Sequence, residues 1–324
     1  MTAMTVVAAA EQEDVLGPDY TSQTIPLRPD AEGPVVATLI RRNPQRQSRR
    51  AVLYLHGFVD YFFHTHVADA FAVHGYDFYA LDLRKYGRSL LAGQTPYYST
   101  DIAEYDEEID AAIDMIRAEG HDQVVAYGHS TGGLIFPLWA NRRRGKGLIQ
   151  AMVLNSPFFD LNASDFERGF LTKLVDKVGR FAPRIIVSKL QSPYARALHT
   201  SNGGEWEFDP EWKKLVAFPV RAGWLRTIRR GHARIARGID LDVPILVAAS
   251  TASGDGREGS PQLADTDCVL NVEHMVTGAQ RIGPDVTVVR IESGLHDLTL
   301  SPPAVRQKFL DEVFDWLGAT LPVD

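Results

Sequence analysis

Six short runs of apolar residues recur along the chain, and segments with a different spacing of apolar positions lie between them. Each run is nearly unbroken, which is typical of a β-strand that is buried on both faces. The segments between them, such as residues 100–119, place apolar side chains three or four positions apart, as one face of an α-helix requires. Strands that alternate with helices predict a parallel sheet covered by helices on both faces. The six runs are residues 51–55, 76–81, 124–127, 149–154, 243–249 and 286–291.

Residues 158–240 interrupt this alternation. They contain no buried-strand pattern, and helical spacing of apolar residues begins near Asp165 and returns in the arginine-rich stretch 221–238. We expect residues 158–240 to be a helical cap inserted into an α/β core. The core itself is predicted to consist of residues 22–157 and 241–324.

The N-terminal residues give no sign of a targeting segment. Residues 1–21 are predicted to be a tail, because the mildly apolar start has no preceding Lys or Arg, and a hairpin of residues 22–28 and 34–41 is predicted to follow. No apolar run approaches the roughly 20 residues needed to span a bilayer, so no integral membrane segment is predicted. Cys268 is the only cysteine, which excludes an intramolecular disulfide and favours a reducing, cytoplasmic compartment. The net charge of −7 argues against nucleic acid as a partner.

The segment Gly128-His129-Ser130-Thr131-Gly132 lies where a predicted strand ends and a predicted helix begins. A sharp strand-to-helix turn needs small residues two positions before and two positions after its central residue, and Gly128 and Gly132 meet that need. Such a turn raises the Ser130 hydroxyl above the end of the sheet. The following helix directs its N-terminal N–H groups at negative charge formed there. The pattern therefore predicts a nucleophile elbow suited to attack on an acyl carbon.

A serine nucleophile needs a base that accepts its proton and a carboxylate that holds the base in the right tautomer. We expect His296 to be the base, because it follows the last predicted strand, where side chains gather at the carboxyl ends of parallel strands. Asp255, Asp265 and Asp267 all lie between the preceding strand and His296. We favour Asp267 because a predicted helix begins directly after it, and Asp265 and Asp255 are alternatives. Asp297 is expected to cap its own loop.

The oxyanion that forms during acyl transfer needs two N–H donors. The N–H group of Thr131, directly after the nucleophile, is predicted to be one donor. The N–H group of Phe58, in a His-Gly-Phe turn after the first buried run, is the predicted second donor. His64 and His66 lack the spacing of a metal motif and no other ligand set occurs in the sequence, so no metal site is predicted.

These motifs together resemble those of the α/β-hydrolase superfamily, and within it those of bacterial monoacylglycerol lipases and lysophospholipases. The resemblance covers residues 22–318 and implies an eight-stranded, mostly parallel sheet, a Ser–His–Asp triad and no cofactor. In that group the acid follows its strand almost directly, whereas a long insertion precedes Asp267 here. The segments that carry the resemblance are His56-Gly57-Phe58, Asp82-Leu83-Arg84-Lys85-Tyr86-Gly87-Arg88-Ser89, Gly128-His129-Ser130-Thr131-Gly132-Gly133, Ser156-Pro157 and Gly294-Leu295-His296-Asp297.

The sequence thus predicts a serine hydrolase that cleaves a small-molecule carboxylic ester through an acyl-enzyme intermediate. The aromatic and aliphatic residues of 158–240 favour an apolar acyl group. An amidase, a lactonase or a carbon–carbon bond hydrolase on the same triad is an alternative, and a non-catalytic binding protein of the same fold is another. None of these patterns indicates an oligomeric state.

Overall fold

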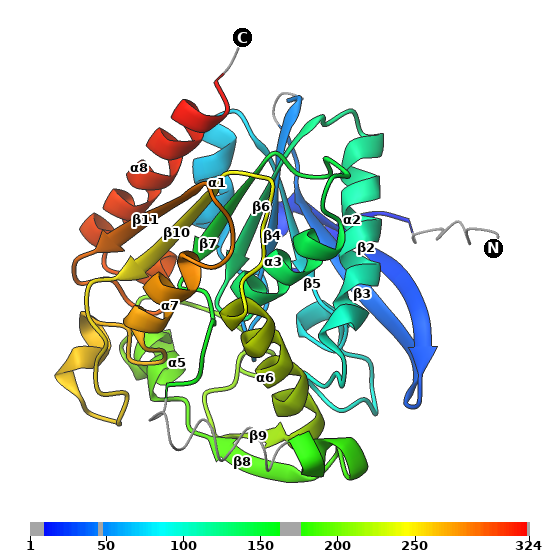
Figure 1. Cartoon of the computed structure of the whole chain (residues 1–324), viewed down its shortest axis with the longest axis vertical. Coiled ribbons are helices and arrows are strands. Elements are labelled where there is room, and N and C mark those ends of the chain that lie inside the picture. The colour runs from blue at the N-terminus through cyan, green and yellow to red at the C-terminus, as the bar shows by residue number, and fades with distance from the viewer. Residues whose placement is uncertain (1–9, 45–47, 163–175, 323–324) are drawn as a thin grey trace.

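The centre of the structure is a nine-stranded sheet, shown in the computed structural model of Figure 1, which describes residues 10–44, 48–162 and 176–322. Its strands lie in the order β1-β2-β3-β5-β4-β6-β7-β10-β11. They are β1 (Gln12–Asp14), β2 (Gly17–Asp30), β3 (Gly33–Arg42), β4 (Arg50–Leu55), β5 (Asp77–Asp82), β6 (Gln123–His129), β7 (Ala151–Asn155), β10 (Ile245–Ser250) and β11 (Val286–Ile291). The pairs from β5 to β11 are parallel, whereas β1, β2 and β3 are antiparallel to their neighbours. The predicted mostly parallel sheet is confirmed.

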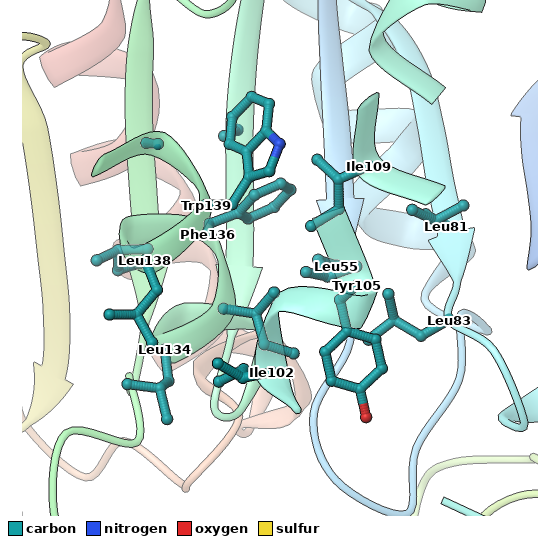
Figure 2. Packing of buried hydrophobic residues seen from close by; sticks show 14 of the residues in the cluster. Leu55, Leu81, Leu83, Ile102, Tyr105, Ile109, Leu134, Phe136, Leu138 and Trp139 are labelled. Carbon is teal, nitrogen blue, oxygen red and sulfur yellow. The ribbon is translucent and has the colours of Figure 1, made fainter. Parts of the chain in front are cut away.

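Helices cover both faces of this sheet (Figure 1). The described helices are α1 (Thr65–Val73), α2 (Asp106–Ala118), α3 (Gly132–Arg142), α5 (Pro193–Leu198), α6 (Ala222–Ala236), α7 (Val272–Ala279) and α8 (Pro303–Thr320), with short 3₁₀ turns η1 (Gly87–Ser89), η2 (Ile102–Tyr105), η3 (Thr200–Asn202), η4 (Pro261–Ala264) and η5 (Leu298–Leu300). Phe71 of α1 and Phe309 of α8 are buried on one face. Figure 2 shows the cluster on the other face, which gathers Ile109 of α2 with Phe136 and Trp139 of α3.

The sheet has nine strands where eight were predicted, because β1 gives no apolar signal. Its sequence is Gln-Glu-Asp, and only Asp14 is buried, where its carboxylate accepts hydrogen bonds of 2.7 Å from the Arg88 guanidinium. An edge strand held by an ion pair does not need the apolar run that marks a central strand. β2 begins at Gly17, so part of the predicted tail 1–21 belongs to the sheet. Residues 1–9 lie outside the described residues.

Residues 158–240 are called the cap region, and their described helices and strands lie beyond the carboxyl ends of the parallel strands, at the bottom of Figure 1. Their described part contains α5, α6 and a two-stranded antiparallel sheet of β8 (Ile186–Leu190) and β9 (Phe218–Arg221). The helical cap that the sequence predicts therefore also contains a short two-stranded sheet, which was not predicted. All five residues of β8 are exposed, so this strand lacks the buried-strand pattern. Of the helix predicted near Asp165, residues 163–175 lie outside the described residues.

The limits of the cap region, residues 158 and 240, stay a prediction.

No helix within the described ranges combines the length and the apolar composition that crossing a bilayer requires.

His232, on the buried side of α6, is the basis of a pH prediction. Burial and the neighbouring Arg229 lower the pKa of His232 to about 3. A histidine in the unfolded chain binds its proton near pH 6.5, so the unfolded state takes up a proton that the folded state does not between pH 6.5 and about 3. The free energy of unfolding therefore falls as the pH falls through this window.

We expect His232→Leu to reduce the loss of unfolding free energy between pH 7.5 and pH 5 by about 2 kcal/mol. Urea denaturation of both proteins at the two pH values measures this difference. An identical loss in the wild type and the variant would contradict the prediction.

Candidate active site

The turn between β6 and α3 has the backbone geometry that its glycines predict. Ser130 has a φ of 51°, in the left-handed region, and its N–H group donates to the Asn155 carbonyl at 3.0 Å. A Cβ atom on Gly128 would lie 2.8 Å from the Gly132 carbonyl carbon, and one on Gly132 would collide with the Leu55 carbonyl oxygen. No larger residue fits at either position. The strained turn therefore depends on both glycines, and it presents Ser130 at the end of β6.

A continuous set of hydrogen bonds joins three side chains that are far apart in the sequence. The Ser130 hydroxyl donates to His296 Nε2 at 3.0 Å, and His296 Nδ1 donates to Asp267 Oδ2 at 2.9 Å. Ser130 is 8% exposed, His296 is 4% exposed and Asp267 is fully buried. The structure thus brings together the predicted nucleophile, base and acid with the spacing that proton transfer requires.

Asp267 is held in place by its own local backbone. Its Oδ1 atom accepts hydrogen bonds from the N–H groups of Val269 at 2.9 Å and Leu270 at 2.8 Å, which leaves Oδ2 for His296. The two alternative carboxylates are elsewhere. Asp255 pairs with Arg257, and Asp265 is exposed at the end of η4. The geometry therefore favours Asp267 over both alternatives, even though a long insertion precedes it.

The two predicted oxyanion donors lie beside Ser130. Neither the Phe58 N–H group nor the Thr131 N–H group has a hydrogen-bond acceptor within residues 10–44, 48–162 and 176–322. Phe58 follows Gly57, and a Cβ atom on Gly57 would lie only 3.1 Å from the Ser130 Cβ atom, so this turn packs directly on the elbow. His56 braces the turn, because its ring contacts the Gly57 carbonyl at 2.8 Å and accepts from the Leu83 N–H group at 3.1 Å.

His129 is adjacent to Ser130 in sequence but does not act on the same hydroxyl. Its Nδ1 atom donates to the Asn155 carbonyl at 3.2 Å, and its ring lies 5.0 Å from the His296 ring. Burial is the main cause that lowers the pKa of His129 to about 4. This side chain is therefore neutral near pH 7, and His296 is the histidine that contacts the nucleophile.

Asp297 has a larger structural role than the loop cap that the sequence predicts. It does cap its loop, because Oδ1 accepts from the Thr299 N–H group at 3.0 Å. The same atom accepts from Asn155 Nδ2 at 2.7 Å, and Oδ2 contacts His64 Nε2 at 3.0 Å. Burial alone would raise the pKa of Asp297, but His129, His64 and Thr299 hold it well below its usual value. A buried carboxylate thus anchors the loop that carries His296 to two other segments, those of Asn155 and His64.

Replacing Asp297 by alanine is expected to lower the free energy of unfolding by about 3–5 kcal/mol, because its buried donors lose their shared acceptor. Urea denaturation measures the change. The exposed Asp265 provides the matched control, since Asp265→Ala is expected to change the free energy by less than about 0.5 kcal/mol. Similar losses in the two variants would show that Asp297 is not an anchor.

The sequence of the chain places this site in a known family. Residues 46–254, more than half of the chain, match the family described as serine aminopeptidase, S33. The chain belongs to this family. Its fold is the α/β-hydrolase fold, which confirms the predicted superfamily and fold class. As a member of the family it is a serine hydrolase, which confirms the predicted class of enzyme.

Several characterised proteins resemble this family member. A curated monoacylglycerol lipase of Mycolicibacterium smegmatis is 27% identical over 284 residues, which cover 86% of this chain and 91% of that lipase. The crystal structure of the Paleococcus ferrophilus monoacylglycerol lipase has a TM-score of 0.65 and 17% identity, and covers 88% of this chain and 99% of that one. The crystal structure of a soluble variant of monoglyceride lipase from Saccharomyces cerevisiae has a TM-score of 0.67 and 14% identity, and the match covers 92% of this chain and 95% of that one. At these identities the two structures establish the fold alone.

Proposed function

We propose that this hydrolase cleaves carboxylic esters through an acyl-enzyme intermediate on Ser130. The observation that carries the proposal is the pair of hydrogen bonds that runs from the Ser130 hydroxyl through His296 to Asp267. The two N–H groups of Phe58 and Thr131, which have no acceptor in the described part of the chain, add the donors that a tetrahedral oxyanion needs.

In the first half of the reaction, Ser130 Oγ attacks the ester carbonyl carbon while its proton passes to His296 Nε2. The carbonyl oxygen takes the negative charge and accepts hydrogen bonds from the Phe58 and Thr131 N–H groups. Asp267 stabilises the imidazolium of His296 through the 2.9 Å hydrogen bond to Nδ1. The imidazolium then returns its proton to the leaving alkoxide, and the alcohol departs from the acyl-enzyme.

In the second half, water attacks the acyl-enzyme carbonyl and gives its proton to His296 Nε2. The same two N–H groups hold the second oxyanion. When that intermediate collapses, the carbon–oxygen bond to Ser130 breaks and His296 returns the proton to Ser130 Oγ. The carboxylic acid then leaves, and Ser130 is ready for the next ester.

The acyl group of the substrate is proposed to be apolar. Beside Ser130, the Phe58 ring lies among aromatic rings of Trp224, Phe218 and Tyr97, so the surroundings of the reacting carbon disfavour a charged acyl chain. The names of the lipase relatives, which describe monoacylglycerol and monoglyceride hydrolysis, support the same class of substrate.

A panel of p-nitrophenyl esters of increasing acyl length, a monoacylglycerol, a lactone and an aminoacyl p-nitroanilide tests the proposal. The anilide belongs in the panel because the family is described as an aminopeptidase family. We expect kcat/KM to rise from acetate to medium-chain esters, and to exceed that for the anilide and the lactone by at least about 100-fold, which corresponds to about 2.7 kcal/mol of transition-state stabilisation. Turnover of the anilide or the lactone without ester turnover would replace the proposal by the corresponding alternative. No turnover of any substrate would favour a binding protein.

A further inference from the structure

The side chain of Phe58 is enclosed by aromatic rings, and two of the three come from the cap region. The indole of Trp224 in α6 stacks on the Phe58 ring, with centroids 3.7 Å apart and an angle of 20° between the planes. Phe218 of β9 and Tyr97 of the core contact the same ring edge-on, at 5.7 Å and 5.9 Å. The residue that carries one proposed oxyanion donor is therefore held largely by the cap region.

The backbone directly after Phe58 is strained. Val59 has a φ of 53°, in the left-handed region, and its side chain is buried. A β-branched residue rarely adopts this conformation, because its Cβ substituents crowd the backbone. Such a conformation persists only where neighbouring contacts hold it. Contacts on either side of Val59 must therefore maintain the turn that sets the direction of the Phe58 N–H group.

The cap region also holds the residues that follow Val59. Lys213 Nζ donates to Asp60 Oδ1 at 2.7 Å, and both side chains are buried. The backbone N–H group of Asp209 donates to the Tyr61 hydroxyl at 2.7 Å. Burial alone would raise the pKa of Asp60, but Lys213 and two histidines hold it below its usual value, so the Asp60 carboxylate stays ionised. The strained Val59 thus lies between two points that the cap region anchors.

We infer that the cap region keeps residues 57–61, the oxyanion loop, in the conformation that directs the Phe58 N–H group at the reacting carbonyl, and that Trp224 is a positioning residue for this donor. The inference rests on the proposed function, because it concerns the oxyanion of that reaction. Trp224 acts through Phe58, since its described ring contact is with Phe58 and not with His296. Loss of the stacked ring should therefore weaken the transition state more than substrate binding.

Trp224→Leu, which keeps a buried apolar side chain without a ring, tests the inference on a p-nitrophenyl ester. Losing one oxyanion donor costs about 10²–10³ in kcat, so a displaced donor is expected to lower kcat by about 10–100-fold with KM within about threefold of wild type. Trp224→Phe restores a stacked ring and is expected to keep kcat within about threefold of wild type. A trifluoromethyl ketone, whose adduct carries the oxyanion, should lose affinity for Trp224→Leu by the same factor as kcat/KM.

Trp206→Leu is the matched control. Trp206 is also an indole of the cap region that packs on the core, where its Nε1 atom donates to the Leu300 carbonyl at 3.0 Å, but it lies against His66 and Arg306 and not against Phe58. This variant is expected to keep the wild-type kcat. A fall in kcat shared equally by Trp206→Leu and Trp224→Leu would show a general effect on the cap region and overturn the inference.

Val59→Gly separates positioning from stability. Glycine adopts a positive φ without strain, so the oxyanion loop no longer needs the same hold from the cap region. Adding Val59→Gly to Trp224→Leu is expected to restore kcat by at least about threefold.

Lys213→Met, which removes the ion pair with Asp60, provides an independent test and is expected to lower kcat with little change in KM.

Wild-type kcat in Trp224→Leu or Lys213→Met, or a loss expressed only as a higher KM, would overturn the inference. Failure of the wild type to hydrolyse any ester would instead remove the proposed function, and it is detected before the variants are compared.

Discussion

Replacing Asp267 by asparagine is expected to lower kcat by about 10⁴-fold while the protein stays folded. The Oδ1 atom of Asp267 accepts two backbone N–H groups, so the amide oxygen of asparagine keeps that position and its NH₂ group turns to His296. Facing a donor, His296 Nδ1 must become an acceptor, and its proton moves to Nε2. In that tautomer His296 cannot take the proton of Ser130. Steady-state kinetics on a p-nitrophenyl ester measures the loss, and circular dichroism checks the fold.

Asp255→Asn and Asp265→Asn are the matched controls for this prediction. Both residues lie in the insertion that precedes Asp267, and Asp255 pairs with Arg257 rather than with His296. Each control is expected to keep the wild-type kcat. If either control loses activity to the extent expected of Asp267→Asn, then Asp267 is not the acid that orients His296.

Ser130→Ala is expected to lower kcat by about 10⁴–10⁶-fold, because the variant has no hydroxyl at the atom that contacts His296 Nε2. The adjacent Thr131 does not replace it, since its buried hydroxyl has no hydrogen-bond partner in the described residues and so no base to activate it. Initial rates at saturating ester, compared with the uncatalysed rate, measure the effect.

Ser156→Ala is a close structural control for the nucleophile. Ser156 follows β7 as Ser130 follows β6, it is fully buried, and its φ of 48° is nearly the same. Its hydroxyl has no partner within the described ranges, so the alanine variant is expected to hydrolyse the ester at the wild-type rate. Equal losses of activity in Ser130→Ala and Ser156→Ala would mean that substitution at either strained turn lowers activity, and that the Ser130 hydroxyl has no special role in ester hydrolysis.

The order of strands and helices was predictable because buried parallel strands are apolar throughout, and the positions of Ser130 and His296 followed from the ends of those strands. β1 was missed because three polar residues at a sheet edge carry no such pattern. The cap was predicted to be helical because the exposed β8 shows no alternation of buried and exposed positions. The local spacing of apolar residues predicts a strand or helix only when that element is buried, because burial is what requires a regular apolar pattern.

The contacts that support the site were not predictable from sequence, because each joins segments that are distant along the chain. Asp297 contacts His64 and Asn155, and Trp224 stacks on Phe58. Phe58 and Asp297 lie in recognisable motifs, but those motifs do not indicate which distant residues these side chains contact. The strained backbone of Val59 could not be predicted from the sequence either, because valine ordinarily favours β-strands. The sequence motifs predicted the reacting groups, whereas the contacts that hold those groups in place became visible only in the three-dimensional structure.

Reaction of the wild type with a fluorophosphonate, followed by intact mass and peptide mapping, is the most direct test of an activated nucleophile at Ser130. The account predicts one covalent adduct on Ser130, strongly slowed labelling of Asp267→Asn, and no adduct on Ser130→Ala. An unlabelled wild type, or an adduct that persists in Ser130→Ala, would contradict it.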